Sequence, residues 1–345
     1  MTELEDFLAR EVDAGSFPGA VALVGTGDAV VEVAAAGQAV IEPERLPATP
    51  DTVYDLASLT KPLVSGALVA AAFPRLDLSS PPGRYLPEWK ATRFDGVTIE
   101  TLLVHTSGLP AWRPLYAWGE GPAAYRRTLA AIEPETRPGE RVTYSDLNFL
   151  VLGELLEAHF SAPLDAAFAD LVRGGAGGKA SFVPGRTGNV AATERDDATE
   201  RGMAVVMGVS YSRFRTGVVW GEVHDGNAFR RGGVAGNAGL FGTARDVWAL
   251  SRPWLDPSRR EFVADRTPSL VEARGLAWQG SRGAGSAVPK MPESAFGHTG
   301  FTGTSVWIDP ERRRIFVLLT NRIHPGVRGS DFNAVRRRFH ELVWS

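Results

Sequence analysis

The chain has no cysteine in its 345 residues, and it has six histidines. Without cysteine there is no disulfide bond, no thiol nucleophile and no metal site built from thiolates. The spacings of His105, His224 and His298 match no zinc-binding pattern. The glycine-rich stretch 232–239 lacks the spacing of a nucleotide-binding loop, so we interpret it as a close-packed backbone crossing or a gating loop. We therefore expect no metal and no other cofactor.

A long apolar segment is also missing from the chain. No stretch approaches the ~18 consecutive apolar residues that a membrane span requires. The acidic segment from Thr2 to Asp6 is not followed by the apolar core of a signal peptide. These features predict a protein that has no membrane partner and is located in the cytoplasm.

The chain has little excess of charge of either sign. It contains 37 lysines and arginines against 40 acidic residues, which gives a formal net charge of −3 at pH 7. This balance does not favour a nucleic-acid partner, and we interpret the arginine clusters 312–314 and 336–338 as a solvated turn and a helix face. The length and a hydrophobic content of 44% are typical of a globular protein with one large domain or two smaller ones.

Lysine is the scarcest charged residue, with four copies at positions 61, 90, 179 and 290. Lys61 follows Ser58 by three residues. Arginine keeps its proton, whereas a partly buried lysine can lose it and act as a base. A serine activated by a lysine one helical turn away is a known nucleophile. The alternative is that Ser58 only caps the start of a helix.

Apolar periodicity predicts strands near both ends of the chain and a helical, loop-rich body between them. We therefore expect one sheet built from residues 1–57 and 238–345, with residues 58–237 as an inserted, mainly helical region. Five helices are expected: one that begins at a capping box of Thr2 and Glu5, one that begins near Ser58, two that cover 99–106 and 147–160, and a last one with Phe332, Val335, Phe339 and Leu342 on one face. The expected strands are 20–24, 29–35, 304–308 and 315–319.

Two further motifs can take part in catalysis. The first is Tyr144-Ser145-Asp146, because a loop tyrosine beside a lysine can relay a proton. Its alternative role is again to cap a helix through Ser145 or Asp146. The second is the stretch 297–303, Gly-His-Thr-Gly-Phe-Thr-Gly, whose glycines let a substrate approach the backbone. A plain β-turn would also explain these glycines.

The three motifs in this order resemble the class C β-lactamases and penicillin-binding-protein-like serine hydrolases. Residues 104–110, 239–244 and 320–322 are similar to this family too, and the likeness runs from about residue 15 to 343. The resemblance implies an α/β (α+β) fold with an antiparallel sheet flanked by helices and an inserted mainly helical region. It also implies an active site in the cleft between the two parts.

The resemblance implies a role for each matching residue. Ser58 would be acylated, and Lys61 and Tyr144 would share the duties of general base and proton return. The backbone N–H groups of Ser58 and Phe301 would form the oxyanion hole. The residues implied to contact the substrate are Asp146, His298, Thr299 and Gly300.

Two departures from the family pattern bear on the substrate. Asp146 stands where the family's Tyr-x-Asn motif has an amide, so a hydrogen-bond donor is lost if the carboxyl group is ionised. His298 stands where β-lactamases usually carry the lysine of Lys-Thr-Gly, and an unperturbed imidazole is mostly neutral at pH 7. Both changes favour other members of the family over an efficient β-lactamase.

The sequence therefore predicts a serine hydrolase that acts through an acyl-enzyme on a small ester, amide or D-amino-acid peptide. A true β-lactamase or a DD-carboxypeptidase is the alternative within the family. A catalytically inactive member that binds a peptide or a partner protein is the alternative of another class. The sequence does not indicate the natural substrate, the oligomeric state, or which of Lys61 and Tyr144 is the first base.

Overall fold

The computed structural model describes residues 2–90, 96–119, 121–186, 189–327 and 331–344. Within these residues a seven-stranded antiparallel sheet has the order β3-β2-β1-β12-β11-β10-β9, and two smaller sheets have the orders β4-β8-β5 and β6-β7. The strands are β1 (Gly19–Thr26), β2 (Val30–Val40), β3 (Leu46–Pro47), β4 (Tyr54–Asp55), β5 (Ser181–Phe182), β6 (Ala192–Arg195), β7 (Val218–Trp220), β8 (Leu240–Gly242), β9 (Gln279–Gly280), β10 (Phe296–Thr299), β11 (Ser305–Asp309) and β12 (Arg314–Thr320).

The helices are mostly short. The α-helices are α1 (Glu3–Asp13), α2 (Ala67–Ala72), α3 (Ile99–Leu103), α4 (Gly121–Ala131), α5 (Asp146–Phe160), α6 (Leu164–Phe168), α7 (Gly174–Ala176), α8 (Ala198–Val206), α9 (Gly226–Arg230), α10 (Ala244–Ser251), α11 (Arg260–Val263) and α12 (Phe332–Val343). The other helical turns are η1 (Ala57–Leu59), η2 (Lys61–Gly66), η3 (Pro82–Arg84), η4 (Pro87–Trp89), η5 (Leu115–Ala117), η6 (Ala169–Arg173), η7 (Arg252–Leu255) and η8 (Pro257–Arg259). None of the described helices has the length and apolar character of a membrane-crossing segment.

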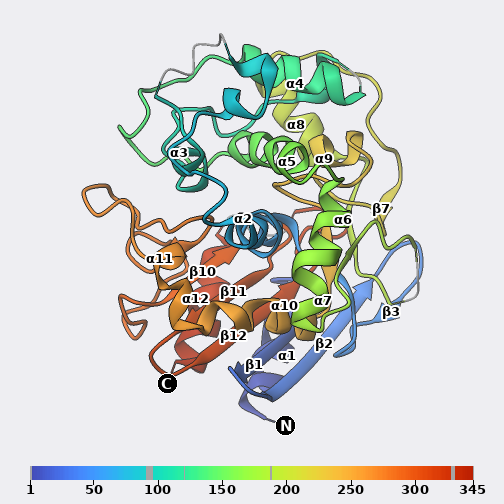
Figure 1. Cartoon of the computed structure of the whole chain (residues 1–345). Coiled ribbons are helices and arrows are strands. Elements are labelled where there is room, and N and C mark those ends of the chain that lie inside the picture. The colour runs from blue at the N-terminus through green and yellow to red at the C-terminus, as the bar shows by residue number, and fades with distance from the viewer. Residues whose placement is uncertain (1, 91–95, 120, 187–188, 328–330, 345) are drawn as a thin grey trace.

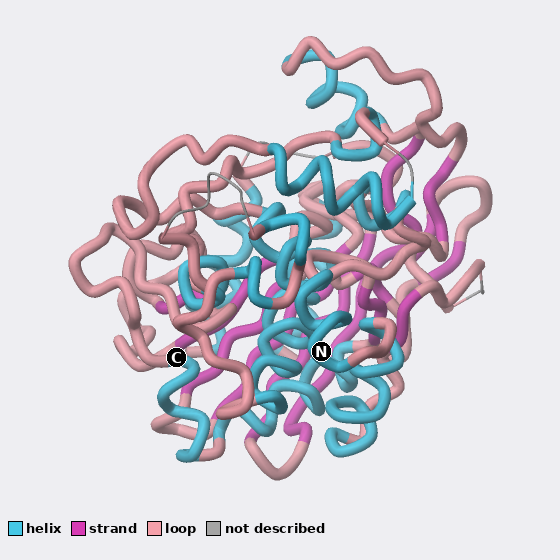
Figure 2. The backbone as a smooth tube through the Cα atoms, turned by 45° about the horizontal axis from the view of Figure 1, so that its top comes forward, coloured by secondary structure: helices cyan, strands magenta, loops and turns pink. Residues whose placement is uncertain are grey.

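Strands from the two ends of the chain form the large sheet together. β1 pairs with β2 on one side and with β12 on the other, so Leu23 lies between Val33 and Val317. The predicted hairpin at 20–35 and the predicted strands at 304–308 and 315–319 are thereby confirmed, although β2 extends past residue 35 to Val40. Figure 2 shows the strands running side by side through the molecule, with helices along them.

Alternation along β1 sends side chains to two different cores. Ala20 and Ala22 pack with α1 and α12, whereas Val21 and Leu23 belong to the larger core shared with the middle of the chain. Because successive strand residues point to opposite faces, each face of the sheet needs its own helical cover. Figure 1 shows both chain ends at the sheet, while α4, α5 and α8 lie at the other end of the molecule. This arrangement confirms the predicted α/β fold with an antiparallel sheet flanked by helices; the division at residues 57 and 238 stays a prediction.

The helix that follows Ser58 is irregular. A 3₁₀ turn, η1, precedes the π-helical segment η2, and regular α2 begins only at Ala67. Pro62 lies at the start of η2 and has no N–H to donate to a preceding turn, so the usual helical pattern is interrupted there. A helical segment therefore begins near Ser58, as predicted, but its first turns are 3₁₀ and π-helical rather than α-helical.

Two further segments place the site. Helix α5 is buried along most of its length, and the Ser145 hydroxyl accepts from the N–H of Asn148, so the predicted cap is present. A Cβ added to Gly236 would lie 2.2 Å from the carbonyl oxygen of Phe149 in α5. The stretch 232–239 thus crosses α5 at a distance that only glycine permits, in agreement with the interpretation as a close-packed crossing.

Candidate active site

A pocket of about 490 Å³ brings the residues of the three motifs together. Residues from all three motifs line this pocket, while Lys61 is completely buried behind it. The predicted site residues that line it are Ser58, Tyr144, Asp146, His298, Thr299, Gly300 and Phe301.

Ser58 lies in a turn that a buried carboxylate holds in place. The residue before it, Ala57, has a φ of 47°, which is unusual for a residue with a side chain. The Ala57 N–H donates to Asp55 Oδ1 (2.8 Å), and the His224 N–H donates to Asp55 Oδ2 (2.7 Å). A left-handed alanine costs about 1–2 kcal/mol, and these contacts stabilise the turn that directs Ser58 into the pocket.

Gly300 brings the other side of the pocket close to this turn. A Cβ added at Gly300 would lie 2.1 Å from Thr304 Oγ1 and 2.9 Å from the carbonyl oxygen of Leu56. The Thr304 hydroxyl also donates to that carbonyl (3.1 Å). Glycine is therefore required here for the segment after β10 to approach the serine turn.

Lys61 has an acceptor for each of its three N–H groups. Its Nζ lies 2.8 Å from Ser58 Oγ, 2.6 Å from Asp146 Oδ1 and 3.5 Å from the carbonyl oxygen of Asn237. Burial alone would lower the pKa of Lys61, but the Asp146 carboxylate and the Tyr144 side chain outweigh it and raise the pKa. Lys61 is thus held as an ammonium that donates to the serine.

The Lys61–Asp146 pair was not predicted from the sequence. The pattern suggested that Asp146 replaces an amide that would contact the substrate. In the structure Asp146 lines the pocket and is also the ion-pair partner of Lys61, with 23% of its side chain exposed. The two residues are 85 positions apart, so no local spacing indicates the pair.

Tyr144 lies over Lys61 and is supported by His105. The Lys61 Nζ is 4.8 Å from the centre of the Tyr144 ring, and the His105 ring centre is 4.6 Å from it. The Nδ1 of His105 accepts from the Ser145 N–H (3.0 Å), which fixes the turn that carries Tyr144. Burial, with the nearby Arg274 cation, lowers the pKa of His105 well below its usual range, so this imidazole is neutral. The family likeness of residues 104–110 did not predict this supporting role of His105.

His298 is a buried neutral imidazole at the end of β10. Its Nδ1 lies 2.9 Å from the Thr299 carbonyl oxygen and donates to it. Burial, followed by the cations of Lys61 and Arg274, lowers its pKa well below the usual range. As expected from the sequence, no permanent cation stands at this position.

Arginines supply the positive charge that His298 lacks. Arg336 is 7% exposed and donates through Nη2 to the carbonyl oxygens of Gly300 (2.7 Å) and Thr304 (3.1 Å). Arg322 donates through Nε to the carbonyl oxygen of Phe301 (2.9 Å). Both line the pocket, and within the described part of the chain neither has a carboxylate within 4.0 Å. We call Arg322 and Arg336 the arginine wall.

Residues 336–338 lie on α12, in agreement with the predicted helix face, but Arg336 is buried in the pocket wall. The side chains of Arg337 and Arg338 are 39% and 50% exposed, whereas Arg336 faces the core side of α12. Burial lowers the pKa of Arg336 to about 9, with the nearby Arg322 as the second cause. The helical spacing indicates that Arg336 lies on the buried face, because it comes four residues after Phe332 and three before Phe339 on the apolar face.

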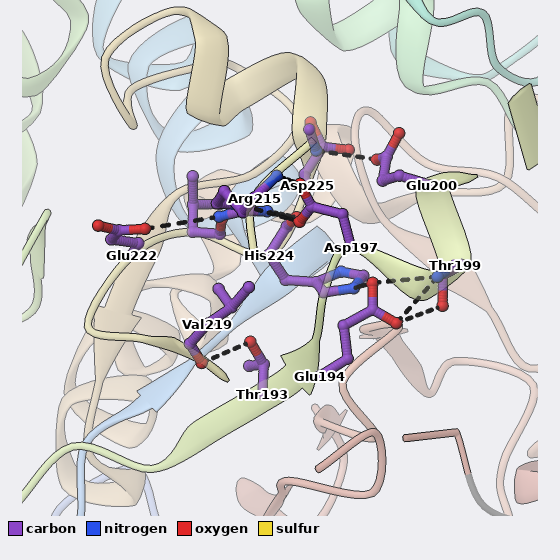
Figure 3. Close-up of polar contacts among 12 residues, drawn as sticks. Thr193, Glu194, Asp197, Thr199, Glu200, Arg215, Val219, Glu222, His224 and Asp225 are labelled. Atoms are coloured by element: carbon purple, nitrogen blue, oxygen red, sulfur yellow. Dashed lines mark hydrogen bonds and ion pairs between the residues drawn. The ribbon is translucent and has the colours of Figure 1, made fainter. Parts of the chain in front are cut away.

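A second wall of the pocket carries acidic groups, shown in Figure 3. Glu200 of α8, Asp225 before α9 and Asn237 line the pocket there, and we call these three residues the acidic wall. His224 also lines the pocket: its Nε2 is 2.8 Å from Glu194 Oε1, and its ring is stacked on Phe301 with a centroid distance of 5.4 Å. Neither Glu200 nor Asp225 is predicted from the sequence, because both come from stretches without a recognisable motif.

No group of three or more His, Asp or Glu side chains suited to a metal ion occurs in the described residues. The chemistry that the pocket offers is that of a serine, a buried ammonium and a phenol. Such a set is suited to nucleophilic attack by the serine and transfer of its proton.

The chain is similar to known proteins over almost its whole length. The sequence profile of the family described as Beta-lactamase matches residues 4–338. A Salmonella agona (strain SL483) protein named "Putative D-alanyl-D-alanine carboxypeptidase" is 29% identical over 322 residues, which cover 83% of this chain and 73% of that protein.

Solved structures show the same fold. EstCE1, described as a hydrolase with promiscuous acyltransferase activity, matches with a TM-score of 0.75 at 20% identity and covers 99% of this chain and 97% of its own. A class C β-lactamase from Rhodobacter sphaeroides matches with a TM-score of 0.70 at 18% identity and covers 97% of both chains.

Proposed function

Because the chain belongs to the β-lactamase family of serine hydrolases, we propose that it cleaves small esters, amides or D-amino-acid peptides through an acyl-enzyme on Ser58. The family membership confirms the resemblance predicted from the three motifs. The observation that carries the assignment of the nucleophile is the 2.8 Å contact between Lys61 Nζ and Ser58 Oγ at the edge of the pocket. A serine that only capped a helix would not need a buried lysine beside its hydroxyl group.

The first half-reaction forms the acyl-enzyme. Ser58 Oγ attacks the carbonyl carbon of the substrate, a C–O bond forms, and the carbonyl electrons move onto its oxygen. We assign the stabilisation of this oxyanion to the backbone N–H groups of Ser58 and Phe301, because preorganised donors are the most effective way to bind developing charge. The tetrahedral intermediate then collapses, and the leaving group departs with a proton.

The proton of Ser58 needs an acceptor other than Lys61. Lys61 already carries its proton, which Asp146 and Tyr144 favour. We therefore assign a relay to Tyr144: its oxygen accepts the serine proton while its own phenolic proton passes to the leaving group. Lys61 holds both groups in place, because its Nζ donates to Ser58 Oγ and lies 4.8 Å from the centre of the Tyr144 ring. In the second half-reaction water attacks the acyl ester, and the acid and the free Ser58 hydroxyl group are released.

The arginine wall supports a substrate with a carboxylate near the scissile bond. The guanidinium groups of Arg322 and Arg336 donate to carbonyl oxygens, which leaves their charge without a carboxylate partner. His298 does not supply a cation, so these arginines take that role. A terminal carboxylate fits the substrate class in the name of the Salmonella relative, and a D-amino-acid peptide or its ester analogue is therefore the substrate class that we favour. A cytoplasmic location remains a prediction.

Covalent labelling tests the assignment of Ser58. We expect a fluorophosphonate probe to add once per chain, with the mass shift on the peptide that contains Ser58, and to leave the Ser58→Ala variant unmodified. Ser65→Ala is the matched control, because Ser65 is buried and its hydroxyl donates to the Gly236 carbonyl oxygen. Wild-type protein that is folded yet stays unlabelled contradicts the proposal and favours a partner-binding role. Rates with nitrocefin, p-nitrophenyl butyrate and D-alanyl p-nitroanilide separate lactamase, esterase and peptidase activity.

A further inference from the structure

The acidic wall holds two carboxylates that form no ion pair within 4.0 Å among the described residues. On this side of the pocket each cation already has its own partner: Lys61 pairs with Asp146 (2.6 Å), His224 with Glu194 (2.8 Å) and Arg215 with Asp197 (2.7 Å). Figure 3 shows the last two pairs, with Glu200 and Asp225 beside them. Within the described ranges no lysine, arginine or histidine lies within 4.0 Å of the Glu200 or Asp225 carboxylate.

The partners of these two carboxylates are neutral donors. Glu200 accepts from the Gly226 N–H (2.8 Å) and from the Tyr116 hydroxyl (2.7 Å). Asp225 accepts from the Ala228 N–H (2.7 Å) at the start of α9. These contacts fix both carboxylates in place, but they do not cancel their charge.

Burial makes the negative charges unfavourable in the empty pocket. Burial and the nearby Asp225 raise the pKa of Glu200 to about 7. Burial and the nearby Asp146 raise the pKa of Asp225 to about 6. A buried carboxylate without a cation is stabilised when an opposite charge arrives within about 4–6 Å. The wall is therefore suited to a positively charged ligand group.

Asn237 adds an unsatisfied acceptor to the same wall. Asn237 is 1% exposed and lies beside Asp225, and its Oδ1 has no partner among the residues that the structure describes. A buried acceptor without a donor is unfavourable. A ligand that brings N–H groups to this wall would relieve that cost, and a protonated amine brings both N–H groups and a positive charge.

We propose that Glu200, Asp225 and Asn237 bind a protonated amino group of the substrate, so that the pocket selects short peptides with both a free amine and a free carboxylate. This inference rests on the proposed function. In a peptide the amino terminus belongs to the acyl part and the carboxyl terminus to the leaving part. The acidic wall and the arginine wall are joined by no ion pair in the described residues, so each is available to one end of such a substrate.

Protection of Ser58 from a fluorophosphonate measures binding to the pocket without requiring turnover. We compare D-alanyl-D-alanine with its N-acetyl derivative, and Nα-acetyl-L-lysyl-D-alanyl-D-alanine with its diacetyl derivative. The first pair tests the α-amine of the acyl residue itself, and the second tests a side-chain amine further from the scissile bond. Because a charge-assisted contact is worth more than a neutral one, we expect the free amine to protect at a concentration about tenfold lower in at least one pair.

Variants assign this preference to the wall. Asp225→Asn keeps an acceptor for the Ala228 N–H, and Glu200→Gln keeps an acceptor for the Gly226 N–H or the Tyr116 hydroxyl. Both variants are made, so that the test still works when one of them does not fold. Each is expected to reduce the preference to about threefold or less. Glu222→Gln is the matched control, because Glu222 is 46% exposed and outside the pocket lining. A ratio of concentrations is measured, so partial loss of folded protein does not change it.

Equal protection by free and acetylated members of both pairs in the wild type would overturn the amine site while leaving Ser58 as the nucleophile. A preference that both variants retain would also overturn it. Failure of the probe to label Ser58 at all concerns the proposed function instead.

Discussion

Charges in the interior of this protein and charges on the pocket walls are balanced in different ways. Inside, Lys61, His224 and Arg215 each lie within 2.8 Å of a carboxylate. On the walls, Arg336 donates to carbonyl oxygens and Glu200 accepts from neutral groups. Backbone dipoles can satisfy the hydrogen bonds of a charged group without neutralising it. The wall groups are therefore available to pair with a charged ligand, whereas the interior pairs serve the fold and the nucleophile.

The largest expected effect comes from breaking the pair next to Ser58. Lys61→Met leaves Asp146 without its cation, and the free energy of unfolding should fall by up to about 3–5 kcal/mol, less any relief from the exposed part of Asp146. Chemical denaturation followed by circular dichroism measures the change. The double variant Lys61→Met/Asp146→Asn should recover most of the stability, because it removes both charges. An unchanged free energy of unfolding in Lys61→Met would show that the Lys61–Asp146 pair does not stabilise the fold, and would remove the contrast between paired interior charges and unpaired wall charges.

A smaller effect is expected at the His224–Glu194 pair, and it depends on pH. Burial opposes the charge of each group, but their contact raises the pKa of His224 above its ordinary 6.5 and lowers that of Glu194 below its ordinary 4.5. The stabilisation by His224 is complete below pH 6.5 and is lost as the pH rises through its raised pKa. The stabilisation by Glu194 is complete above pH 4.5 and is lost as the pH falls through its lowered pKa.

Glu194→Gln should therefore lower the free energy of unfolding most between pH 4.5 and 6.5. We expect a loss of about 1.5–3 kcal/mol in this window and a smaller loss at alkaline pH. Thermal unfolding across the pH range measures it, with the exposed Glu222→Gln as the control. A loss that is constant from pH 5 to pH 9 would contradict a charged pair.

The smallest effects are expected at two neighbouring arginines of α12, one on the arginine wall and one on the surface. Arg336→Gln should reduce protection of Ser58 by D-alanyl-D-alanine about tenfold, because a charged contact to the carboxylate is lost. Arg337→Gln should leave protection unchanged and alter the free energy of unfolding by less than about 1 kcal/mol, since the Arg337–Asp331 pair is exposed. Equal effects of the two substitutions would remove the distinction between a wall arginine and a surface arginine.

Local patterns in the sequence carried the prediction of the sheet and of the first and last helices. The alternation in β1 and the apolar spacing in α12 depend on neighbours a few residues apart, so they can be recognised without a fold. The motifs at Ser58, Tyr144 and His298 were recognised for the same reason. Helix α3 is shorter than predicted, because His105 adopts a φ of 59°, which ends the helix.

Charge partners were beyond the reach of such patterns. Asp146 reaches Lys61 across 85 positions, and Glu200 and Asp225 meet only because α8 and α9 fold against the same pocket. A carboxylate in a sequence looks the same whether it is paired, buried or exposed. Its role depends on distance and burial, and both are properties of the tertiary structure.

The bridging carboxylate of Asp55 has a consequence for altering specificity by exchange of loops. One of its oxygens holds the turn before Ser58, and the other holds the backbone of His224, which precedes Asp225 of the acidic wall. A graft that replaces the segment carrying the acidic wall therefore also changes the support of the nucleophile. Position 55 and the backbone at position 224 need to be transplanted as one unit, and new substrate preferences are more readily introduced through side chains than through whole loops.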